Sequence, residues 1–262
     1  MNDQRLPTGI SELDSLLHGG LVKGRSYLFT GDTGTGKTIA CLQLLHGALE
    51  QGEKVLYVTV DERPSEITDS ALSFSWNLQQ HIQDKNLAIL DASPYFSGRS
   101  GNAGEKGIDP QKIVADLGNY IRRLGATMLI IDPVTPFILP SEANSPAQDQ
   151  ARALINLIQT QISTTNILTA HFSTRANQDQ TFGIEEFLAS GVFALKVQRV
   201  GDIFERSLTI RKMRGTPVLP AEYRFEIRPD AGIVLQTRSA DPGVNAKTVA
   251  APMFEYFELP GK

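Results

Sequence analysis

The chain has 262 residues, of which 41% are hydrophobic, and this is enough for one large α/β domain or two small ones. The formal net charge of -4 shows no basic excess, so any nucleic-acid surface would have to be a local patch. A single cysteine, Cys41, excludes an intramolecular disulfide framework and supplies too few ligands for a structural zinc site. The chain has no apolar signal core and no run of about 18 apolar residues, so we expect a cytoplasmic protein without a membrane segment.

Short apolar runs alternate with helical patterns over most of the chain, which is typical of repeated β-α units on a mostly parallel sheet. Five apolar runs predict core strands, at 25–30, 54–60, 86–92, 127–132 and 166–170. Apolar residues at helical spacing predict flanking helices at 38–52, 110–124 and about 147–163. Asp109 is the expected N-cap of the helix at 110–124, and Gly125 is expected to end it.

The pattern changes after residue 190. The segments GVFALKVQRV and ERSLTIRKM flank a Gly-Asp pair, which predicts an antiparallel hairpin, and residues 223–227 and 232–236 predict further edge strands. We therefore expect an α/β domain over residues 1–237 whose mostly parallel, helix-flanked sheet carries a C-terminal antiparallel extension. The tail at 238–262 is expected to be only partly ordered, although MFEYFEL, residues 253–259, is apolar enough to dock.

The stretch GDTGTGKT, residues 31–38, lies between the first predicted strand and the first predicted helix. Its residues fit the phosphate-loop pattern G-x-x-x-x-G-K-[ST], and the strand before it and the helix after it disfavour a chance glycine-rich turn. Glycines let backbone N–H groups point at phosphate oxygens, Lys37 would neutralise the β- and γ-phosphates, and the Thr38 hydroxyl would ligate Mg²⁺. The predicted nucleotide-binding residues are Gly31, Thr33, Gly34, Thr35, Gly36, Lys37 and Thr38.

Carboxylates follow two of the predicted strands. Asp132 comes after four apolar residues in TMLIIDP and matches a Walker-B aspartate that ligates Mg²⁺, the alternative being a turn aspartate before proline. Asp61 and Glu62 end the segment KVLYVTVDE, where a carboxylate across the site from the metal can act as general base. The alternative for this pair is a solvated acidic loop, and the sequence does not decide which of the two acts. With Lys37, Asp61 and Glu62 are the predicted catalytic residues.

Other polar residues stand near the ends of later strands. His171 follows the strand at 166–170, where it either senses the γ-phosphate or has no role. Lys212 and Arg214 are two apart, so alternation predicts that both share a face with Leu208 and Ile210. Both basic residues are either solvated or reach a phosphate across a subunit boundary, as arginine fingers do.

These motifs together resemble a single KaiC-type ATPase domain of the RecA superfamily over about residues 6–228. The resemblance is carried by LPTGISELDSLLHGGLVKGRSYLFTGDTGTGKT, VTVDE, LIID, GIEEFLASGVFALKV and KMRGTPVLPAEYRFEI. It implies a RecA-like core with ATP between neighbouring subunits of a homohexameric ring. It also implies roles for Lys37 and Thr38 on ATP and Mg²⁺, for Asp132 as the Walker-B residue, for Asp61 and Glu62 as the catalytic acidic pair, and for Lys212 and Arg214 on the neighbour's nucleotide. The family pair reads Glu-Glu, so Asp61 is one methylene shorter.

The chain also departs from the circadian clock members of this family, which carry two such domains. Their second domain autophosphorylates on an adjacent Ser-Thr pair. Counting back from Lys212, those positions fall on Glu186 and Phe187. The chain therefore resembles the ATP-hydrolysing first domain, and we expect no clock-type autokinase activity.

Three functions follow from this sequence. The first is a regulatory ATPase ring that signals its nucleotide state to partner proteins. The second is a RadA- or helicase-like motor on DNA, against which the pI of about 5.6 argues, although Arg99 and Lys106 in the loop at 97–109 could face a ring channel. The third is a nucleotide-binding scaffold with negligible turnover.

Overall fold

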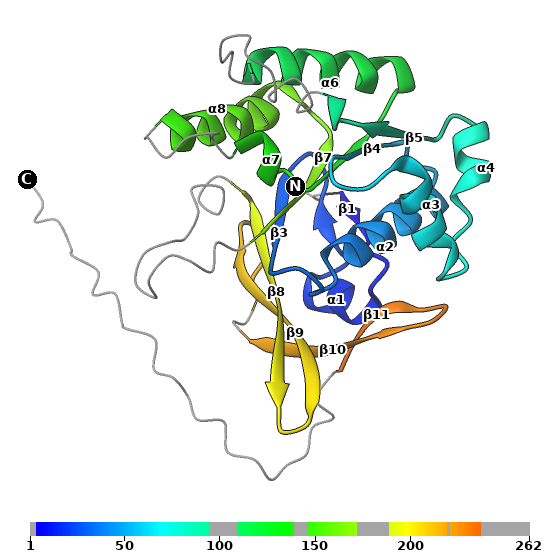
Figure 1. The fold of residues 1–262 in the computed structure, drawn as a ribbon, viewed down its shortest axis with the longest axis vertical. Coiled ribbons are helices and arrows are strands. Elements are labelled where there is room, and N and C mark those ends of the chain that lie inside the picture. The colour runs from blue at the N-terminus through cyan, green and yellow to red at the C-terminus, as the bar shows by residue number, and fades with distance from the viewer. Residues whose placement is uncertain (1–3, 95–108, 139–145, 172–188, 219–220, 237–262) are drawn as a thin grey trace, which may run out of the picture.

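The computed structural model describes residues 4–94, 109–138, 146–171, 189–218 and 221–236. The expectations for Arg99, Lys106, Glu186, Phe187 and the tail at 238–262 lie outside these residues. Within the described part, nine strands form one sheet in the order β11-β10-β9-β8-β3-β7-β6-β4-β5, with helices on both faces (Figure 1). The predicted α/β class is confirmed.

The five predicted core strands are confirmed as one parallel block of the sheet. All residues of the four inner strands are buried, as expected for a parallel sheet covered on both faces, whereas the edge strand β5 is partly exposed. The strands are β3 (Ser26–Thr30), β4 (Val55–Thr59), β5 (Leu87–Asp91), β6 (Met128–Asp132) and β7 (Thr165–Ala170).

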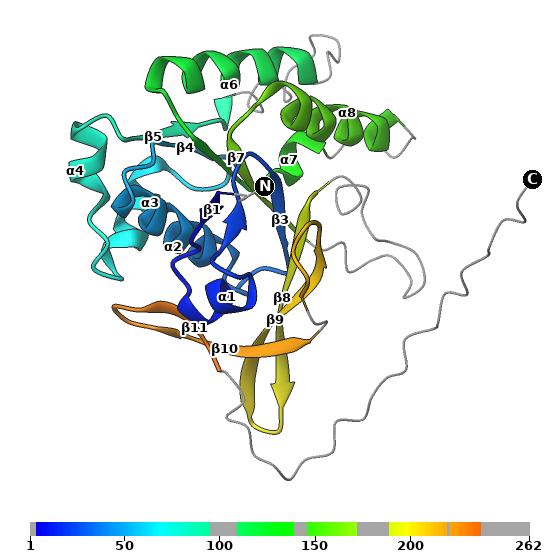
Figure 2. The same ribbon diagram turned by 180° about the vertical axis from the view of Figure 1, so that it is seen from behind.

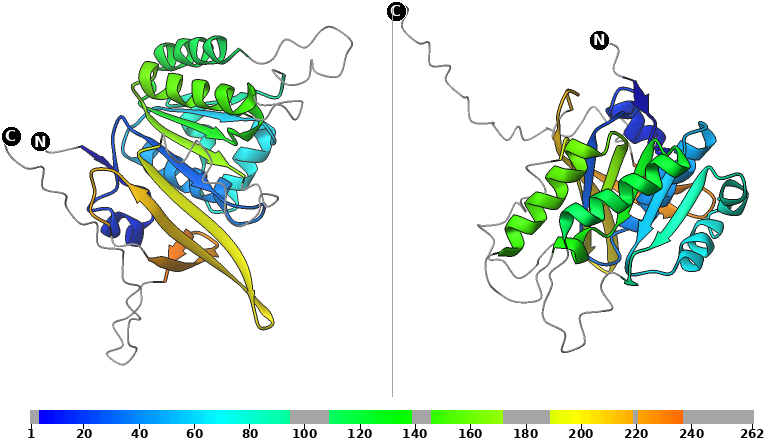
Figure 3. Two further views of the ribbon diagram at one scale, coloured as in Figure 1. Left: turned by 90° about the vertical axis from the view of Figure 1, so that its left-hand side faces the viewer. Right: turned by 90° about the horizontal axis from the view of Figure 1, so that it is seen from above.

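The three predicted helices are α2 (Lys37–Glu50), α6 (Pro110–Leu124) and α8 (Pro146–Gln161), and they lie on opposite faces of the sheet (Figure 3). Helix α2 packs into one apolar core, and α6 and α8 pack into the other. The expected ends of α6 are confirmed, since Asp109 Oδ1 accepts a hydrogen bond of 2.9 Å from the Gln111 backbone N–H and Gly125 adopts a left-handed φ of 71°.

Helices α3 (Pro64–Leu72), α4 (Leu78–Gln83) and α7 (Thr135–Ile138) were not predicted. Helix α3 nevertheless carries a start signal, because Pro64 occupies its first turn and the Glu66 carboxylate accepts a 2.7 Å hydrogen bond from the Arg63 backbone N–H. Of the helices in the described residues, not one combines the length and apolar character that a bilayer span requires.

The N-terminal segment forms a small unit that covers α2 and was not predicted either. It consists of β1 (Arg5–Leu6), α1 (Ser11–Leu16) and β2 (Leu21–Val22), with β1 and β2 paired antiparallel. Its buried leucines belong to the same apolar core as α2, so the segment shields the outer side of that helix.

The predicted C-terminal hairpin is confirmed as β8 (Gly191–Val200) and β9 (Ile203–Met213), followed by β10 (Glu222–Arg228) and β11 (Gly232–Leu235) at the sheet edge. Strand β8 also pairs parallel with β3, which joins this extension to the core. The first half of β8 is buried and the second half is exposed, because the hairpin tip projects beyond the sheet (Figure 2).

A bulge in this hairpin changes which residues of β9 share a face. Phe193 pairs with Ile210, but its neighbour Val192 pairs with Lys212, so Arg211 is the extra residue. Phe193 packs in the core of α2 and Val192 in the core of α6 and α8. Because paired residues project to one face, the prediction that Lys212 shares a face with Leu208 and Ile210 is wrong.

Candidate active site at the carboxyl ends of the strands

A cavity of about 480 Å³ lies where the parallel strands β3, β4, β6 and β7 end. Its volume is in the range of small-molecule sites, and carboxyl ends of parallel strands are where such sites form in open α/β sheets. The residues that line it are Thr33, Gly34, Gly36, Lys37, Thr38, Ile39, Asp61, Glu62, Asp132, Pro133, His171, Arg206 and Ile227. Three widely separated sequence motifs therefore meet at one place.

Most of the predicted phosphate-loop residues line this cavity, and Gly31 and Thr35 support the loop instead. Gly34 and Gly36 adopt left-handed φ angles of 79° and 104°, which favour glycine. A side chain at Gly31 would put its Cβ 2.5 Å from the Leu195 carbonyl oxygen. Thr35 Oγ1 donates a 2.8 Å hydrogen bond to the Asp32 carbonyl oxygen. The loop runs directly into the N-terminus of α2, where backbone N–H groups without helical partners attract anions.

Lys37 is the first residue of α2 and is buried with its ammonium over the loop. Its Nζ donates 2.8 Å hydrogen bonds to the carbonyl oxygens of Gly31 and Asp32. Burial lowers the pKa of Lys37, and the carboxylates of Asp132 and Asp32 oppose this shift. A buried cation next to helix N–H groups is an arrangement that suits a multiply charged phosphate.

Asp132 ends strand β6 and is held by hydrogen bonds from both neighbouring strands. The Tyr57 hydroxyl on β4 donates to Oδ2 at 2.8 Å, and the Thr169 hydroxyl on β7 donates to Oδ1. Burial, and then the negative charge of Asp132, raises the pKa of Tyr57, so the phenol stays a donor. The orientation of the carboxylate is therefore fixed, as second-sphere groups fix metal-binding carboxylates.

These residues fit a magnesium ion brought in by a nucleotide. In the described part of the chain, no group of three or more His, Cys, Asp or Glu residues could hold a metal ion. Magnesium in nucleotide sites needs less, because one or two carboxylates and a hydroxyl suffice when phosphate oxygens and water complete the shell. The Asp132 carboxylate and the Thr38 hydroxyl both line the cavity and are of this kind.

The two acidic residues after β4 have different surroundings. The side chain of Asp61 is 57% exposed, and its Oδ2 lies 4.0 Å from His171 Nε2. Glu62 is only half-buried, and burial raises the pKa of its carboxyl, with further increases from the charges of Asp132, Glu66 and Asp61. The Thr59 hydroxyl donates a 2.7 Å hydrogen bond to the Glu62 carbonyl oxygen, which fixes the turn. A raised pKa suits a carboxylate that accepts a proton from water, and Glu62 has this property.

His171 follows β7 and faces the same cavity as the acidic pair. Its backbone N–H donates a 3.0 Å hydrogen bond to Thr135 Oγ1. The imidazole therefore lies beside the Asp61 carboxylate in the lining of the cavity.

Lys212 and Arg214 are not among the residues that line the cavity. The Arg214 backbone N–H bonds the Ser190 carbonyl oxygen at 2.7 Å, and the Ser190 N–H bonds the Ser26 carbonyl oxygen at 2.8 Å. Ser26 begins strand β3, whereas the phosphate loop follows its last residue, Thr30. The two ends of a five-residue strand are roughly 13 Å apart. This basic pair therefore lies at the amino ends of the parallel strands, opposite the phosphate loop.

The sequence interpretation missed Arg206 and Ile227, which line the cavity from strands β9 and β10. Within the described residues, Arg206 Nε is buried without a hydrogen-bond partner. Buried donors are normally satisfied, so this N–H is a candidate contact for an anionic ligand. The signal was available, because Arg206 alternates with Leu208 and Ile210, which pack against the core of α2.

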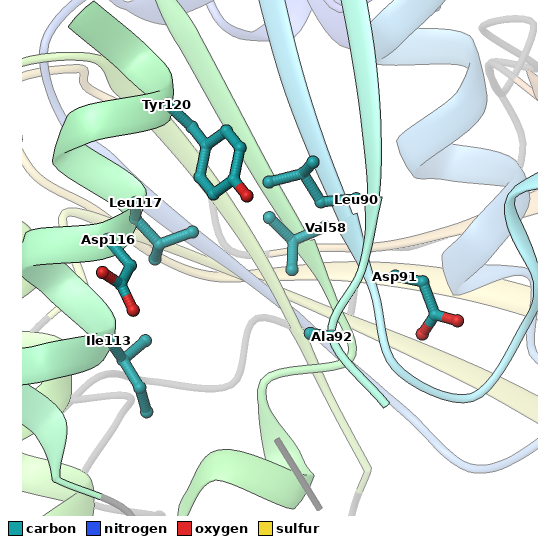
Figure 4. Close-up of a pocket in the computed structure, with 8 residues that line it drawn as sticks. All are labelled: Val58, Leu90, Asp91, Ala92, Ile113, Asp116, Leu117 and Tyr120. Atoms are coloured by element: carbon teal, nitrogen blue, oxygen red, sulfur yellow. The ribbon is translucent and has the colours of Figure 1, made fainter. Parts of the chain in front are cut away.

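A second cavity of about 70 Å³ lies between helix α6 and strands β4 and β5. Figure 4 shows Ile113, Leu117 and Tyr120 of α6 facing Val58 and Leu90 of the strands. This space is far below the volume of a nucleotide site and mostly apolar. The cavity at the phosphate loop is therefore the candidate active site.

Comparison with known proteins gives consistent matches. The family model described as "ATPase: KaiC" matches residues 6–240. The circadian clock oscillator protein KaiC of Thermostichus vulcanus is 35% identical over 225 residues, which are 86% of this chain and 43% of that protein. KaiC of Prochlorococcus marinus strain MIT 9313 is 34% identical over 226 residues, 86% of this chain and 44% of that protein.

A solved structure gives a match over nearly its whole length. The crystal structure of a KaiC-like protein from the archaeon Pyrococcus horikoshii has a TM-score of 0.74 and 31% identity, covering 89% of this chain and 99% of that one. By contrast, the chain spans less than half the length of the curated relatives that it matches.

Proposed function

The chain belongs to the KaiC family of ATPases, with a RecA-like fold, and we propose that it hydrolyses ATP with Mg²⁺ at a site completed by a second copy of the chain. One observation carries this proposal. The cavity gathers the phosphate loop, Glu62 and Asp132 of one chain at the carboxyl ends of the parallel strands. Lys212 and Arg214 of that chain lie at the amino ends of these strands. We assign this activity to one domain over residues 1–237 of a cytoplasmic protein.

ATP binding would use the phosphate loop as its main anchor. Backbone N–H groups from Gly34 to Thr38 and the N-terminus of α2 bind the phosphates, and the Lys37 ammonium exchanges its carbonyl contacts for phosphate oxygens. Thr38 and Asp132 would hold Mg²⁺, which when bound neutralises charge on the β- and γ-phosphates. The Arg206 guanidinium would reach the same phosphates from strand β9, because this residue lines the cavity.

Hydrolysis requires a base beside the γ-phosphate, and we assign this role to Glu62. The water oxygen forms a bond to the γ-phosphorus as the bond to the β–γ bridging oxygen breaks, and Glu62 accepts the proton of the water. That proton then passes to the released phosphate, so the products are ADP and inorganic phosphate. Asp61 and His171 lie together in the lining of the cavity and would orient the water and γ-phosphate.

The neighbouring subunit would supply Lys212 and Arg214 to the γ-phosphate. The β8–β9 hairpin supports a subunit contact, because its outer half exposes four large apolar side chains. These are Val197 (37% exposed), Val200 (41%), Ile203 (60%) and Phe204 (70%). Val197 pairs with Arg206, which lines the cavity, and Phe204 projects from the same face of the hairpin, whereas Val200 and Ile203 pair on the other face. Exposed apolar groups of this size mark protein contacts. The resemblance to KaiC favours a hexameric ring.

A ring whose hydrolysis depends on subunit contacts is suited to regulation, since any protein that shifts those contacts changes turnover. We therefore propose that the nucleotide state is signalled to partner proteins. Autokinase activity of the clock type is not part of this proposal, because the corresponding positions hold Glu186 and Phe187.

Glu62→Gln tests the assigned base. We expect kcat to fall at least about 100-fold while ATP affinity changes less than about threefold, because the amide keeps the shape but accepts no proton. Glu66→Gln, assayed at a pH above the acid limb of activity, is the matched control, since Glu66 caps α3 and does not line the cavity. If Asp61→Asn abolishes turnover and Glu62→Gln does not, Asp61 is the base; a wild type without turnover would support a scaffold instead.

A further inference from the structure

Gln43 on helix α2 is a buried amide that joins its helix to two other segments of the chain. Its Nε2 donates to the carbonyl oxygens of Gly9 (2.8 Å), Ala231 (3.1 Å) and Ile233 (3.3 Å). Its Oε1 accepts a 2.7 Å hydrogen bond from the Ile233 backbone N–H. With 5% of its surface exposed, this side chain links the phosphate-loop helix to the N-terminal segment and to the β10–β11 hairpin.

Two glycines allow these segments to approach Gln43 closely. Gly9 and Gly232 adopt left-handed φ angles of 76° and 71°. A Cβ at Gly9 would lie 2.9 Å from the Gln43 carbonyl oxygen, and a Cβ at Gly232 would lie 2.5 Å from Gln43 Oε1. Neither approach leaves room for a side chain, so the contacts of Gln43 are built into the backbone on both sides.

The contact with β11 reaches the active site through one pair of residues. Ile233, which Gln43 bonds on both its N–H and its carbonyl, pairs with Ile227 in the β10–β11 register. Ile227 lines the cavity, and its Cδ1 lies 3.3 Å from where a Cβ of Gly36 would be. Gln43 therefore sets how closely the hairpin approaches the phosphate loop.

The lining of the cavity divides into a polar and an apolar part. The loop backbone, Lys37 and Asp132 suit phosphates and magnesium, whereas Ile39 and Ile227 offer apolar surface. The uncharged part of a nucleotide is its nucleoside, and apolar walls are what such groups bind.

We propose that Gln43 is a positioning residue of the nucleotide site: it holds the β10–β11 hairpin so that Ile227 forms a wall for the nucleoside of bound ATP. This role depends on the proposed ATPase function. The role concerns the nucleoside and not the phosphates, so it should not affect the binding of inorganic tripolyphosphate, which has no nucleoside.

The test compares ATP with inorganic tripolyphosphate, both with Mg²⁺, by calorimetry on the full chain. In Gln43→Met, which keeps the length of the side chain and removes its hydrogen bonds, we expect ATP affinity to fall about tenfold and tripolyphosphate affinity to change less than about twofold. Ile227→Ala should give the same division without touching Gln43. Ile158→Ala, in the core of α8, is the control for lost stability and should leave the ratio of the two affinities unchanged.

Equal losses for both ligands in Gln43→Met and Ile227→Ala would show that Gln43 only supports the fold, and would overturn the proposal. Unchanged ATP affinity in both variants would overturn it too. If Gln43→Met does not fold, Ile227→Ala decides by the same ratio. A wild-type chain that binds tripolyphosphate but not ATP would refute the positioning role, whereas binding of neither ligand would refute the nucleotide site as a whole.

Discussion

Arg206 within strand β9 and Arg214 just after it have different surroundings. Arg206 lines the cavity of its own chain, and its Nε has no hydrogen-bond partner within the described residues. Arg214, eight residues later, follows the end of the strand at the edge where β3 begins, bonded through its backbone to Ser190 and to Arg25. The segment from Arg206 to Arg214 thus runs along the parallel strands and has a basic residue near each of their ends.

This difference indicates two ways of supplying positive charge to one site. The site at the carboxyl ends of the parallel strands has its own arginine, Arg206, so it can bind phosphate without a residue from another chain. The basic pair Lys212 and Arg214 lies away from this cavity, at the amino ends of the parallel strands, where the proposed function has it reach the nucleotide of a neighbouring chain. Removal of each arginine should therefore have a distinct effect.

The largest effect is expected from Arg214→Ala. An arginine supplied across a subunit boundary contributes about 10³-fold or more to phosphoryl transfer, so kcat should fall by about that factor with ATP affinity nearly unchanged. Turnover and native mass should be measured together, so that loss of assembly is not mistaken for loss of chemistry. Arg211→Ala, an exposed arginine of the same strand, is the control. Full activity in Arg214→Ala would show that Arg214 does not supply charge to the site, and the proposed difference between Arg206 and Arg214 would be wrong.

Arg206→Ala should weaken ATP binding about 10- to 100-fold, because a hydrogen bond to a charged partner contributes about 1.5–3 kcal/mol. The loss should appear even at protein concentrations where the chain is monomeric, since Arg206 serves its own cavity. Arg206→Lys should recover part of the affinity. A defect that appears only in the assembled state would place Arg206 with Arg214 instead.

The hairpin tip gives a smaller effect, on assembly. Phe204→Ser should raise the concentration needed for oligomer formation about tenfold or more, as expected when an exposed aromatic anchor is removed from an interface. Leu72→Ser on helix α3 is a matched control, because Leu72 is 60% exposed and distant in sequence from the hairpin. Sedimentation velocity over a dilution series distinguishes the two variants. Equal behaviour would exclude the hairpin from the subunit contact.

The smallest effect concerns pH. The pKa of Glu62 is raised by burial and by nearby carboxylates, and the base must be deprotonated, so ATPase activity should fall on the acid side at a higher pH than an ordinary glutamate would give. Glu66→Gln removes one of the charges that raise this pKa and keeps the oxygen that caps α3. The acid limb of kcat/KM should therefore move to lower pH. A shift to higher pH would contradict the assignment of Glu62.

Much of this could be predicted from the sequence where local pattern and tertiary structure agree. The apolar runs of β3, β4, β6 and β7 are fully buried and β5 is partly buried, so their composition alone indicates these strands. The cap residues Asp109 and Gly125 define α6 because capping is a local interaction. The phosphate-loop spacing depends on a few backbone angles within eight residues, which is why it could be recognised.

The rest depends on contacts between distant segments. The bulge at Arg211 reverses the face of every later residue, and a single extra residue leaves no mark in an alternating pattern. Gln43 is a polar residue within an apolar helix, and its partners lie 34 and about 190 residues away. Helix α3 is different, because Pro64 and Glu66 form a start signal that the sequence does carry.

The most direct measurement mixes two inactive variants, Glu62→Gln and Arg214→Ala, after dissociation and reassembly. The first lacks the base but supplies Arg214 to its neighbour, and the second has an intact cavity. In a head-to-tail ring, equal mixing pairs an intact cavity with an intact Arg214 at about a quarter of the sites, so about that share of wild-type ATPase should return. A mixture as inactive as its two parents would contradict the shared site, and Arg214 would then serve no neighbour.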